Sequence, residues 1–523
     1  MMEADNKVLK YVIDENGQKH QLTEKMGQGG LGAVWKTSDP NIIVKMKINS
    51  VTGEPVIDEA EYEKYKECLN EVRTLDLPQG IHIAKVASIL QKPYCGYTMR
   101  MLSNMKSVKY WIRSFGEVTV PPAFYRDTGG LRDRLRLLSK AAGIFAKLNY
   151  HSIVYADLSP DNLFVSVDKR AREVWLIDAD NMRYFFQGNR RIMTPGYGAP
   201  EVAAGGMNTL ESDEYTFAVL AHEILTLNSP FQGKMAAKTG NSWDDEDPWD
   251  TSSKSGETKE KAEYIPWIYD QDDTRNAVAP GTGFSPELVM TGKMKELFYR
   301  NFSEEGQKNP ASRPTMREWF EELRRAESLL ITCEHCNNTY YMRSQKKVEC
   351  PFCKKMRTRS VYYAQIVDQY DLDSIMDAEN HAVDEFNRKG DFHIAHLTKE
   401  EVNSIKQVGK RIFDDAQGTY ALYNYQTDDL CALAEEEATI GIKIKDGKYY
   451  VGNLMADRDV EMSLAAEKIG MLKARGVHKF DEIDGLILTI PVSYGRKTLS
   501  DDEAHVVDDI SVLKRRYIKF YKL

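Results

Sequence analysis

The sequence predicts an α+β protein: a two-lobed body, then a small cysteine module and a separate C-terminal α+β domain. From about residue 22, strand-like runs such as AVWK and YTMRML give way to helical patterns such as LRDRLRLLSKAAGIFAKLN, and this order lasts to about residue 328. Two C-x-x-C pairs follow, and the remaining residues mix strand and helix patterns. The chain has 523 residues, a length for which about two to four domains are expected.

The composition is that of a globular protein of a reducing compartment. Hydrophobic residues make up 42% of the chain and the net charge is −9, which argues against nucleic acid or an anionic membrane as the main partner. No apolar run approaches the roughly 18 residues of a spanning helix, and the first residues lack the apolar segment of a signal peptide. We therefore expect a cytoplasmic protein without membrane attachment. Four of the seven cysteines lie in C-x-x-C pairs, which favours metal binding over disulfides.

Changes in pattern along the chain give the expected domain boundaries. An Asn16-Gly17 turn predicts a short strand pair before the main body. Acidic and Ser/Gly/Lys-rich residues predict a partly mobile surface insert inside that body. The expected parts are an N-terminal strand extension (1–22), the two-lobed domain (23–328, with the insert at about 234–280), the cysteine module (329–358) and the C-terminal domain (360–523).

The C-terminal region is expected to contain both helices and strands. The patterns predict helices at Leu372–Asn387 and Val460–Arg475, with a third helix opened by the capping box Thr398-x-x-Glu401. A hairpin is expected to turn at Asp446-Gly447, and LILTIPV is expected to form a strand. The terminal LKRRYIKFYKL alternates basic and aromatic residues. We interpret it as an amphipathic strand, with single-stranded nucleic-acid binding as the alternative.

A glycine-rich segment near the N-terminus is the first candidate phosphate-binding element. Gly27, Gly29 and Gly32 form G-x-G-x-x-G, followed by Ala33 and Val34. Glycines let the backbone approach a phosphate, and the exposed N–H groups can face the anion. Because AVWK predicts a second strand and not a helix, the segment indicates a hairpin over the phosphates and not a dinucleotide-binding turn.

Lys45 ends the apolar strand IIVK, thirteen residues after Gly32. An ammonium there can hold the α- and β-phosphates of a nucleotide and needs a carboxylate to fix its position. Glu71, in the helical segment ECLNEVRTLDL, is the expected partner. Lys47 lies on the same strand face as a rival to Lys45.

Three polar residues further along complete a phosphoryl-transfer pattern. Asp157 in YADLSPDN can orient the proton of an attacking hydroxyl, and Asn162 lies five residues later. Asp178 ends the apolar strand VWLID, so that Asn162 and Asp178 are the expected magnesium ligands. TPGYGAPE (Thr194–Glu201), Asp213 and Arg313 follow in order.

These motifs make residues from about 20 to 328 resemble the Hanks-type (eukaryotic-like) serine/threonine protein kinases. The resemblance implies a two-lobed kinase fold and ATP- and magnesium-dependent phosphorylation of serine or threonine in a protein substrate. It also implies that Glu201 pairs with Arg313, that Asp213 anchors the catalytic-loop backbone, and that Thr194 contacts Asp157. The residues expected next to the adenine are Met99, Arg100 and Met101, in the segment ending at Leu102.

The variants YADLSP and DAD look like those of a divergent bacterial branch of the family. Members of that branch are often encoded beside a metal-dependent protein phosphatase and a von Willebrand A-domain protein, in gene groups of the tellurium-resistance type. The resemblance therefore implies a role in bacterial signalling or stress response, with these two proteins as partners.

Several residues depart from the family pattern. Tyr155 and Ala156 replace the histidine and arginine of the catalytic loop, and Ser159 stands where a lysine often lies near the γ-phosphate. Asp180 replaces the glycine of the metal-binding D-F-G motif; it either adds a carboxylate near the metals or caps a turn. Between Asp180 and Thr194, Tyr184 is the only residue with a hydroxyl group. Because Ala156 removes the usual phosphate receptor, activity is expected not to require phosphorylation of this segment.

The cysteine module predicts a structural zinc site. Cys333, Cys336, Cys350 and Cys353 form two C-x-x-C knuckles separated by thirteen residues, and four thiolates close a tetrahedral site. His335 is a possible substitute ligand. The module resembles a zinc ribbon.

An active protein kinase is therefore the function that the sequence favours. The alternatives are a nucleotide-binding pseudokinase scaffold, a small-molecule kinase, and a nucleic-acid-binding protein with an accessory kinase fold. The complete set of Lys45, Glu71, Asp157, Asn162 and Asp178 argues against the scaffold.

Overall fold

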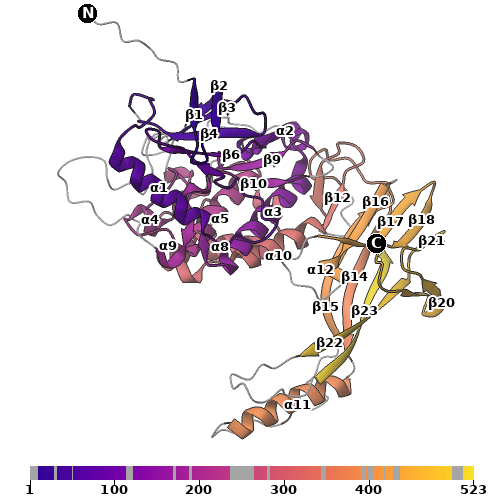
Figure 1. The fold of residues 1–523 in the computed structure, drawn as a ribbon. Helices are drawn as coiled ribbons and strands as arrows, with labels where there is room; N and C mark the ends of the chain where they lie inside the picture. The colour runs from indigo at the N-terminus through magenta and orange to yellow at the C-terminus, as the bar shows by residue number, and fades with distance from the viewer. Residues whose placement is uncertain are drawn as a thin grey trace, which may run out of the picture. The chain divides into compact units, whose positions relative to one another are not determined.

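A computed structural model gives the fold of the chain (Figure 1). It describes residues 10–28, 32–49, 51–112, 122–168, 172–187, 191–235, 264–278, 283–342, 349–370, 372–389, 396, 405–416, 418–427, 436–496 and 510–523. Contacts between residues divide the chain into two compact units, Met1–Arg324 and Arg325–Leu523. The predicted cysteine module and C-terminal domain share the second unit. Gly29, the capping box of Thr398 and Glu401, and most of the predicted insert lie outside the described residues.

The first unit begins with an antiparallel sheet of order β1-β2-β3-β4-β6-β5 in the described residues. Apolar side chains alternate along its central strands, and Val44 and Met46 are fully buried on one face. The predicted turn at Asn16-Gly17 joins the first two strands, with Gly17 at a φ of 80°. The strands are β1 (Tyr11–Ile13), β2 (Lys19–Gln28), β3 (Gly32–Thr37), β4 (Ile42–Lys47), β5 (Ser88–Ile89) and β6 (Gly96–Arg100).

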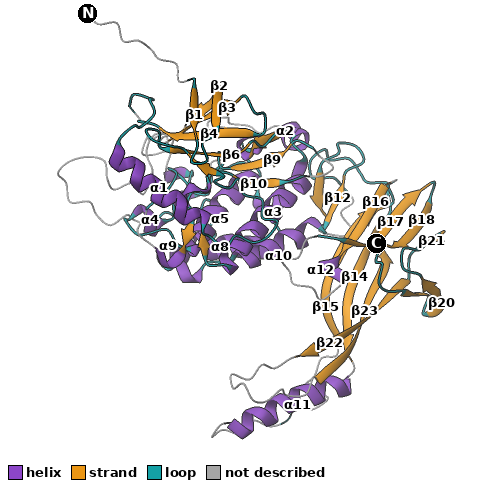
Figure 2. Ribbon diagram, viewed as in Figure 1, coloured by secondary structure: helices purple, strands orange, loops and turns teal. Residues whose placement is uncertain are grey.

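Helices dominate the rest of the first unit (Figure 2). The helix α5 starts at a capping box in which Thr209 and Ser212 satisfy each other's backbone N–H groups, and nearly all of its residues are buried. No helix within the described ranges combines the length and apolar character needed to cross a bilayer. The helices are α1 (Glu59–Arg73), α2 (Pro122–Asp127), α3 (Gly130–Tyr150), α4 (Pro200–Ala203), α5 (Leu210–Thr226), α7 (Pro286–Val289), α8 (Gly292–Phe302), α9 (Glu304–Lys308) and α10 (Met316–Glu327).

Short strands and 3₁₀ turns between the longer helices carry the loops of the candidate site. The strands β7, β9 and β10 form one small sheet, and β8 pairs with β11. These elements are β7 (Met105–Ser107), β8 (Ile153–Val154), β9 (Leu163–Ser166), β10 (Val174–Leu176), β11 (Arg183–Tyr184), η1 (Val108–Trp111), η2 (Ala179–Asn181), η3 (Phe185–Gln187), η4 (Thr274–Asn276) and η5 (Pro310–Ser312).

The described end of the predicted surface insert is packed against the rest of the first unit. Trp267 is 4% exposed, and its indole N–H donates to Nε2 of His222 in α5 at 3.1 Å. Asn276 is fully buried and donates to the carbonyls of Phe231 and Pro266. The acidic and polar composition of the insert as a whole did not indicate that its end is apolar and buried.

The second unit is built mainly from strands. The hairpin of β12 and β13 carries the first cysteine knuckle, and two further sheets have the orders β15-β14-β23-β22-β19-β20 and β16-β17-β18-β21. Apolar side chains from both sheets form one core. The elements are β12 (Leu330–Thr332), β13 (Thr339–Tyr341), β14 (Val361–Tyr370), α11 (Leu372–Lys389), β15 (Ile405–Asp414), β16 (Gly418–Tyr423), α12 (Asn424–Thr427), β17 (Ala438–Lys445), β18 (Lys448–Asn453), β19 (Val460–Leu464), β20 (Glu467–Leu472), β21 (Val477–Phe480), β22 (Leu486–Arg496) and β23 (Ile510–Lys522).

The expected helix at Val460–Arg475 is wrong, because these residues form the hairpin of β19 and β20. Ala465 and Ala466 form its turn, both at positive φ, and Val460 and Met462 alternate into the core. Pairing of β19 with β22 outweighs the helix preference of the Ala, Glu and Lys residues. The expected helix near Leu372, the hairpin at Asp446-Gly447, the strand at LILTIPV and the amphipathic C-terminal strand are confirmed.

A buried ion pair links β14 and β23 inside this core. Arg516 donates through Nε and Nη2 to both carboxylate oxygens of Asp368, at 2.6 and 2.8 Å, and both side chains are at most 3% exposed.

Asp368→Ala would leave the guanidinium of Arg516 buried without its carboxylate. We expect this change to lower the free energy of unfolding of the second unit by about 3–5 kcal/mol. Urea denaturation measures it. Asp481→Ala, which breaks the exposed pair with Lys448, is the control; equal midpoints for the two variants would contradict the prediction.

Candidate active site

The two strands that flank the glycine-rich segment, β2 and β3, pair antiparallel, as the predicted hairpin requires. Gly27 in β2 pairs with Val34 in β3, and Val34 in turn pairs with Lys45 in β4. A Cβ atom at Gly32 would lie 3.1 Å from Cε of Lys45, so this glycine leaves room for the lysine side chain. The described ends of β2 and β3 therefore lie beside Lys45, the position that strands flanking a phosphate-covering loop would need.

Lys45 lies between two carboxylates from the segment after β10. Its Nζ atom is 3.1 Å from Oδ2 of Asp178, and 3.0 and 3.2 Å from Oδ1 and Oδ2 of Asp180. The Lys45 side chain is 12% exposed, so these charges act on its ammonium with little screening by water.

The expected pairing of Lys45 with Glu71 is therefore corrected, because Asp180 takes the place beside Lys45. Glu71 lies on the exposed side of α1. The inward face of that helix carries Tyr65, Cys68 and Val72, spaced by three and four residues. Glu71 comes six positions after Tyr65 and therefore lies on a different face of α1.

Two phenols hold the Asp180 carboxylate from the other side. The hydroxyl of Tyr65 in α1 donates to Oδ2 at 2.8 Å, and that of Tyr97 in β6 donates to Oδ1 at 3.3 Å. The thiol of Cys68 donates to the backbone carbonyl of Asp180 at 3.4 Å. Asp180 is thus not a turn cap: it is buried and bound by groups from β4, β6 and α1.

The charges in this cluster are set by burial and by one another. Burial disfavours the ammonium of Lys45, but Asp180 and Asp178 outweigh it and raise its pKa. Burial also opposes ionisation of Asp180, yet Lys45 and the Tyr65 hydroxyl hold its pKa below the ordinary value. Burial raises the pKa of Asp178 against the opposing effect of Lys45. Burial and Asp180 raise the pKa of both Tyr65 and Tyr97, so both phenols stay protonated donors.

Asp157 lies in the loop between β8 and β9 with its carboxylate fixed at both oxygens. The hydroxyl of Thr194 donates to Oδ1 at 2.9 Å, which confirms the predicted contact. The Asn162 amide donates to Oδ2 at 3.2 Å and to the backbone carbonyl of Asp157 at 2.8 Å. Thus the catalytic-loop aspartate and asparagine predicted from YADLSPDN are side by side.

Asp213 anchors this loop, as predicted. Its carboxylate in α5 accepts hydrogen bonds from the N–H groups of Tyr155 and Ala156, at 2.7 and 2.9 Å. Ala156 has a φ of 76°, a left-handed conformation that costs energy for a residue with a Cβ. The two hydrogen bonds offset that strain. Tyr155, which replaces the family's histidine, donates through its hydroxyl to the carbonyl of Ile177, next to Asp178.

Asn162 and Asp178 are suited to hold a magnesium ion. The N–H of Ile177 donates to the carbonyl of Asn162 at 3.0 Å, which brings the two segments together. Carboxylate and amide oxygens form the donor set that magnesium prefers, and Asp178 is 24% exposed at its side chain. These residues therefore fit the ion that the family implies.

The other expected site residues come from β6, the residue that follows it, the catalytic loop and α4. Met99 is buried in β6, Arg100 is exposed with its guanidinium 5.9 Å from the Trp175 ring centre, and Met101 is half-buried. Ser159 is buried. The predicted ion pair of Glu201 and Arg313 is present, with two hydrogen bonds of 2.8 Å.

Asn208 joins the activation segment, the residues between Asp180 and Thr194, to the catalytic loop, a contact that the sequence did not reveal. Its side-chain oxygen accepts from the N–H of Ile192 at 2.8 Å, and its nitrogen donates to the carbonyls of Ile192 and Ala156 at 2.7 and 3.3 Å. Asn208 is 5% exposed. Its amide therefore makes neutral contacts in a region where many kinases use a phosphate and an arginine.

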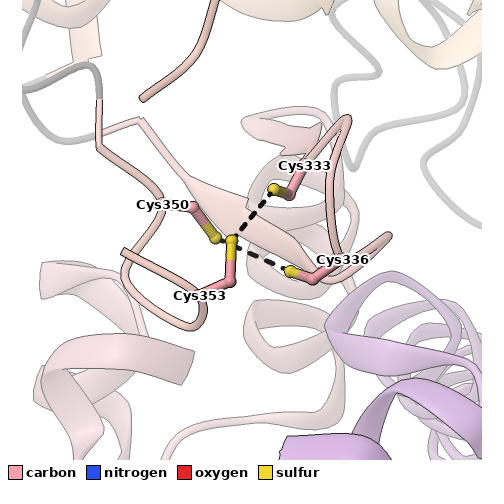
Figure 3. Close-up of side chains that lie close together, drawn as sticks. All are labelled: Cys333, Cys336, Cys350 and Cys353. Atoms are coloured by element: carbon pink, nitrogen blue, oxygen red, sulfur yellow. Dashed lines mark hydrogen bonds between the residues drawn. The ribbon is translucent and has the colours of Figure 1, made fainter. Parts of the chain in front are cut away.

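The four cysteines of the predicted ribbon converge (Figure 3). Their sulfur atoms lie within 4.8 Å of one another, with Cys333–Cys353 and Cys336–Cys350 distances of 3.7 and 3.8 Å. A tetrahedral zinc with bonds of about 2.3 Å needs sulfur atoms about 3.8 Å apart, so the cluster fits this ion. His335 instead turns Nε2 toward the carbonyl of Met356, at 3.0 Å.

The comparison with known families agrees with this geometry. Residues 20–322 match the protein kinase domain. The chain belongs to the protein kinase family.

Three similar proteins each match less than half of the chain. The insulin-like growth factor 1 receptor of Bos taurus is 23% identical over 241 residues, 43% of this chain and 36% of the receptor. That of Xenopus laevis is 22% identical over 225 residues, covering 41% of this chain and 16% of the receptor. The cGMP-dependent protein kinase 2 of Mus musculus is 23% identical over 245 residues, 45% of this chain and 29% of that kinase. The chain thus spans little more than a third of these relatives at most.

The Asn208 contacts predict activity without phosphorylation of the activation segment. Asn208→Ala would remove the side-chain partner of the half-buried N–H and carbonyl of Ile192, at a cost of about 1–3 kcal/mol, so we expect roughly tenfold or greater loss of phosphorylation rate. Tyr184→Phe keeps the ring stacked on Phe186 and should leave the rate unchanged. Progress curves of phosphatase-treated protein should show no lag. A lag that prior autophosphorylation at Tyr184 or Thr194 removes would contradict this prediction.

Proposed function

We propose that this protein is an ATP- and magnesium-dependent protein kinase that phosphorylates serine or threonine in protein partners. The observation that carries the proposal is the Asp157 carboxylate, bound by Thr194 and Asn162 on a loop that Asp213 anchors. The pseudokinase alternative would leave no reason to hold this carboxylate so firmly.

Each residue would have one task in the transfer. Asp157 would orient the substrate hydroxyl and accept its proton, while Lys45 would hold the α- and β-phosphates. Asn162 and Asp178 would hold magnesium, which neutralises charge on the phosphates when it is bound. Gly27, Gly29, Gly32 and Val34 would cover the nucleotide, and the backbone from Met99 to Met101 would meet the adenine.

Two features support serine or threonine as the acceptor and a bacterial setting. Thr194 donates to Asp157, a contact expected of serine/threonine kinases. The YADLSP and DAD variants favour a role in bacterial signalling or stress response. The cognate phosphatase and the von Willebrand A-domain protein would then be the partners.

The proposed chemistry predicts a large effect of two aspartates. Asp157→Asn and Asp178→Ala should each lower phosphorylation by about 100-fold or more, equivalent to about 3 kcal/mol of barrier. Labelled ATP and phosphoamino-acid analysis measure rate and acceptor. Asp161→Asn, an exposed carboxylate of the same loop, is the control and should keep the wild-type rate. An inactive wild-type protein, or aspartate variants with wild-type turnover, would reject the kinase; phosphotyrosine alone would reject the proposed acceptor.

The cysteine cluster is proposed to bind one structural zinc ion. Metal analysis of protein purified without added zinc should give about one equivalent per chain. Cys336→Ser should lower the zinc content and destabilise the second unit. Cys95 is a buried cysteine directly before β6, so Cys95→Ser should not change the zinc content. Folded protein without zinc and with all four thiols open to titration would refute the site.

A further inference from the structure

The lysine of a kinase active site needs a fixed negative charge, and protein kinases generally supply it from a glutamate of the helix after the lysine strand. Here that helix is α1, and the residue it directs at the site is Tyr65, whose hydroxyl reaches Asp180. The carboxylate next to Lys45 comes from a different part of the chain.

We propose that Asp180 is the positioning residue of Lys45 and replaces the helix glutamate in that task. The inference rests on the proposed kinase function and adds the residue that orients the nucleotide-binding lysine. Both oxygens of Asp180 lie within 3.2 Å of Nζ, and the residue is 7% exposed. A charged hydrogen bond between such buried groups fixes the lysine strongly.

The geometry also separates Asp180 from the metal ligands. Oδ1 accepts from Lys45 and Tyr97, and Oδ2 accepts from Tyr65 and Lys45. Both oxygens are thus occupied by protein donors. Asp178, which is more exposed, remains the carboxylate for magnesium.

This arrangement changes what α1 contributes to the site. Asp180 follows Asp178 by two residues, so the counter-charge and the metal ligand lie on one short segment at η2. The helix contributes the Tyr65 hydroxyl and the Cys68 thiol, both neutral donors to Asp180. A shift of α1 would therefore weaken the support of Asp180 without removing the ion pair itself.

Nucleotide binding and turnover of four variants test the proposal. Asp180→Asn should raise the dissociation constant of a magnesium-bound non-hydrolysable ATP analogue about tenfold and lower kcat/KM at least as much. Tyr65→Phe, which removes one donor, should show a smaller change in the same direction. Glu71→Gln and the control Glu67→Gln, both on the exposed side of α1, should match the wild type. If Asp180→Asn does not fold, the comparison of Tyr65→Phe with Glu71→Gln decides whether the carboxylate of Asp180 or that of Glu71 positions Lys45.

A double-mutant cycle distinguishes positioning of Lys45 from any other role. In a Lys45→Ala background, Asp180→Asn should no longer change nucleotide affinity, because the group that it positions is gone. Three results would overturn the proposal. They are an additive loss of nucleotide affinity in the double variant, an effect of Asp180→Asn confined to the magnesium requirement, and a loss of affinity in Glu71→Gln as large as that in Asp180→Asn. Binding is measured without turnover, so an inactive wild-type protein would refute the kinase function and leave this test intact.

Discussion

The active site is organised around one buried positive charge. A lone ammonium inside a protein loses much of its hydration free energy, so Lys45 can stay charged only with anionic partners at contact distance. Asp178 and Asp180 supply them. Because Asp180 is itself bound by Tyr65 and Tyr97, the same charge holds α1, β4, β6 and the segment after β10 in register. The glycine at position 32 belongs to this constraint, since a side chain there would crowd the lysine.

The catalytic loop depends on a second buried carboxylate. Asp213 holds the N–H groups of Tyr155 and Ala156, and so fixes the left-handed turn that directs Asp157 toward Thr194 and Asn162. The departures from the family pattern fit this scaffold. The Tyr155 phenol links the loop to the carbonyl of Ile177, and the small Ala156 leaves the contact with the activation segment to Asn208. Tyr155 and Asn208 thus make neutral contacts that join the catalytic loop to its neighbouring segments.

The sequence predicted the parts of this site whose spacing along the chain is fixed by one turn or one strand. The glycine hairpin, the pair Asp157 and Asn162, and the cysteine knuckles are of this kind. The partner of Lys45 could not be obtained in the same way, because it depends on which face of α1 turns inward. The half-buried Tyr65 and the buried Cys68 and Val72 reveal that face only once the helix is packed. Asn208 was missed because its partners are backbone groups, which leave no pattern in the sequence.

Tertiary pairing explains the main error in the fold. Residues 460–475 have the composition of a helix, yet Val460 and Met462 point into a core made by strands distant in sequence. Alternation of period two was present there but was short, and Ala465 and Ala466 gave no sign of a turn. The buried pair of Asp368 and Arg516 likewise depends on strands that meet only in the folded sheet.

An experimental structure of the protein with a magnesium-bound ATP analogue would test the central claim most directly. The distances from Nζ of Lys45 to the nearby carboxylates are the measurement. The account predicts Asp180 within hydrogen-bonding distance of Nζ, at about 3 Å, with no metal on either of its oxygens and with Asp178 on the metal. A structure in which Glu71 reaches Lys45, or in which Asp180 binds the metal, would contradict it.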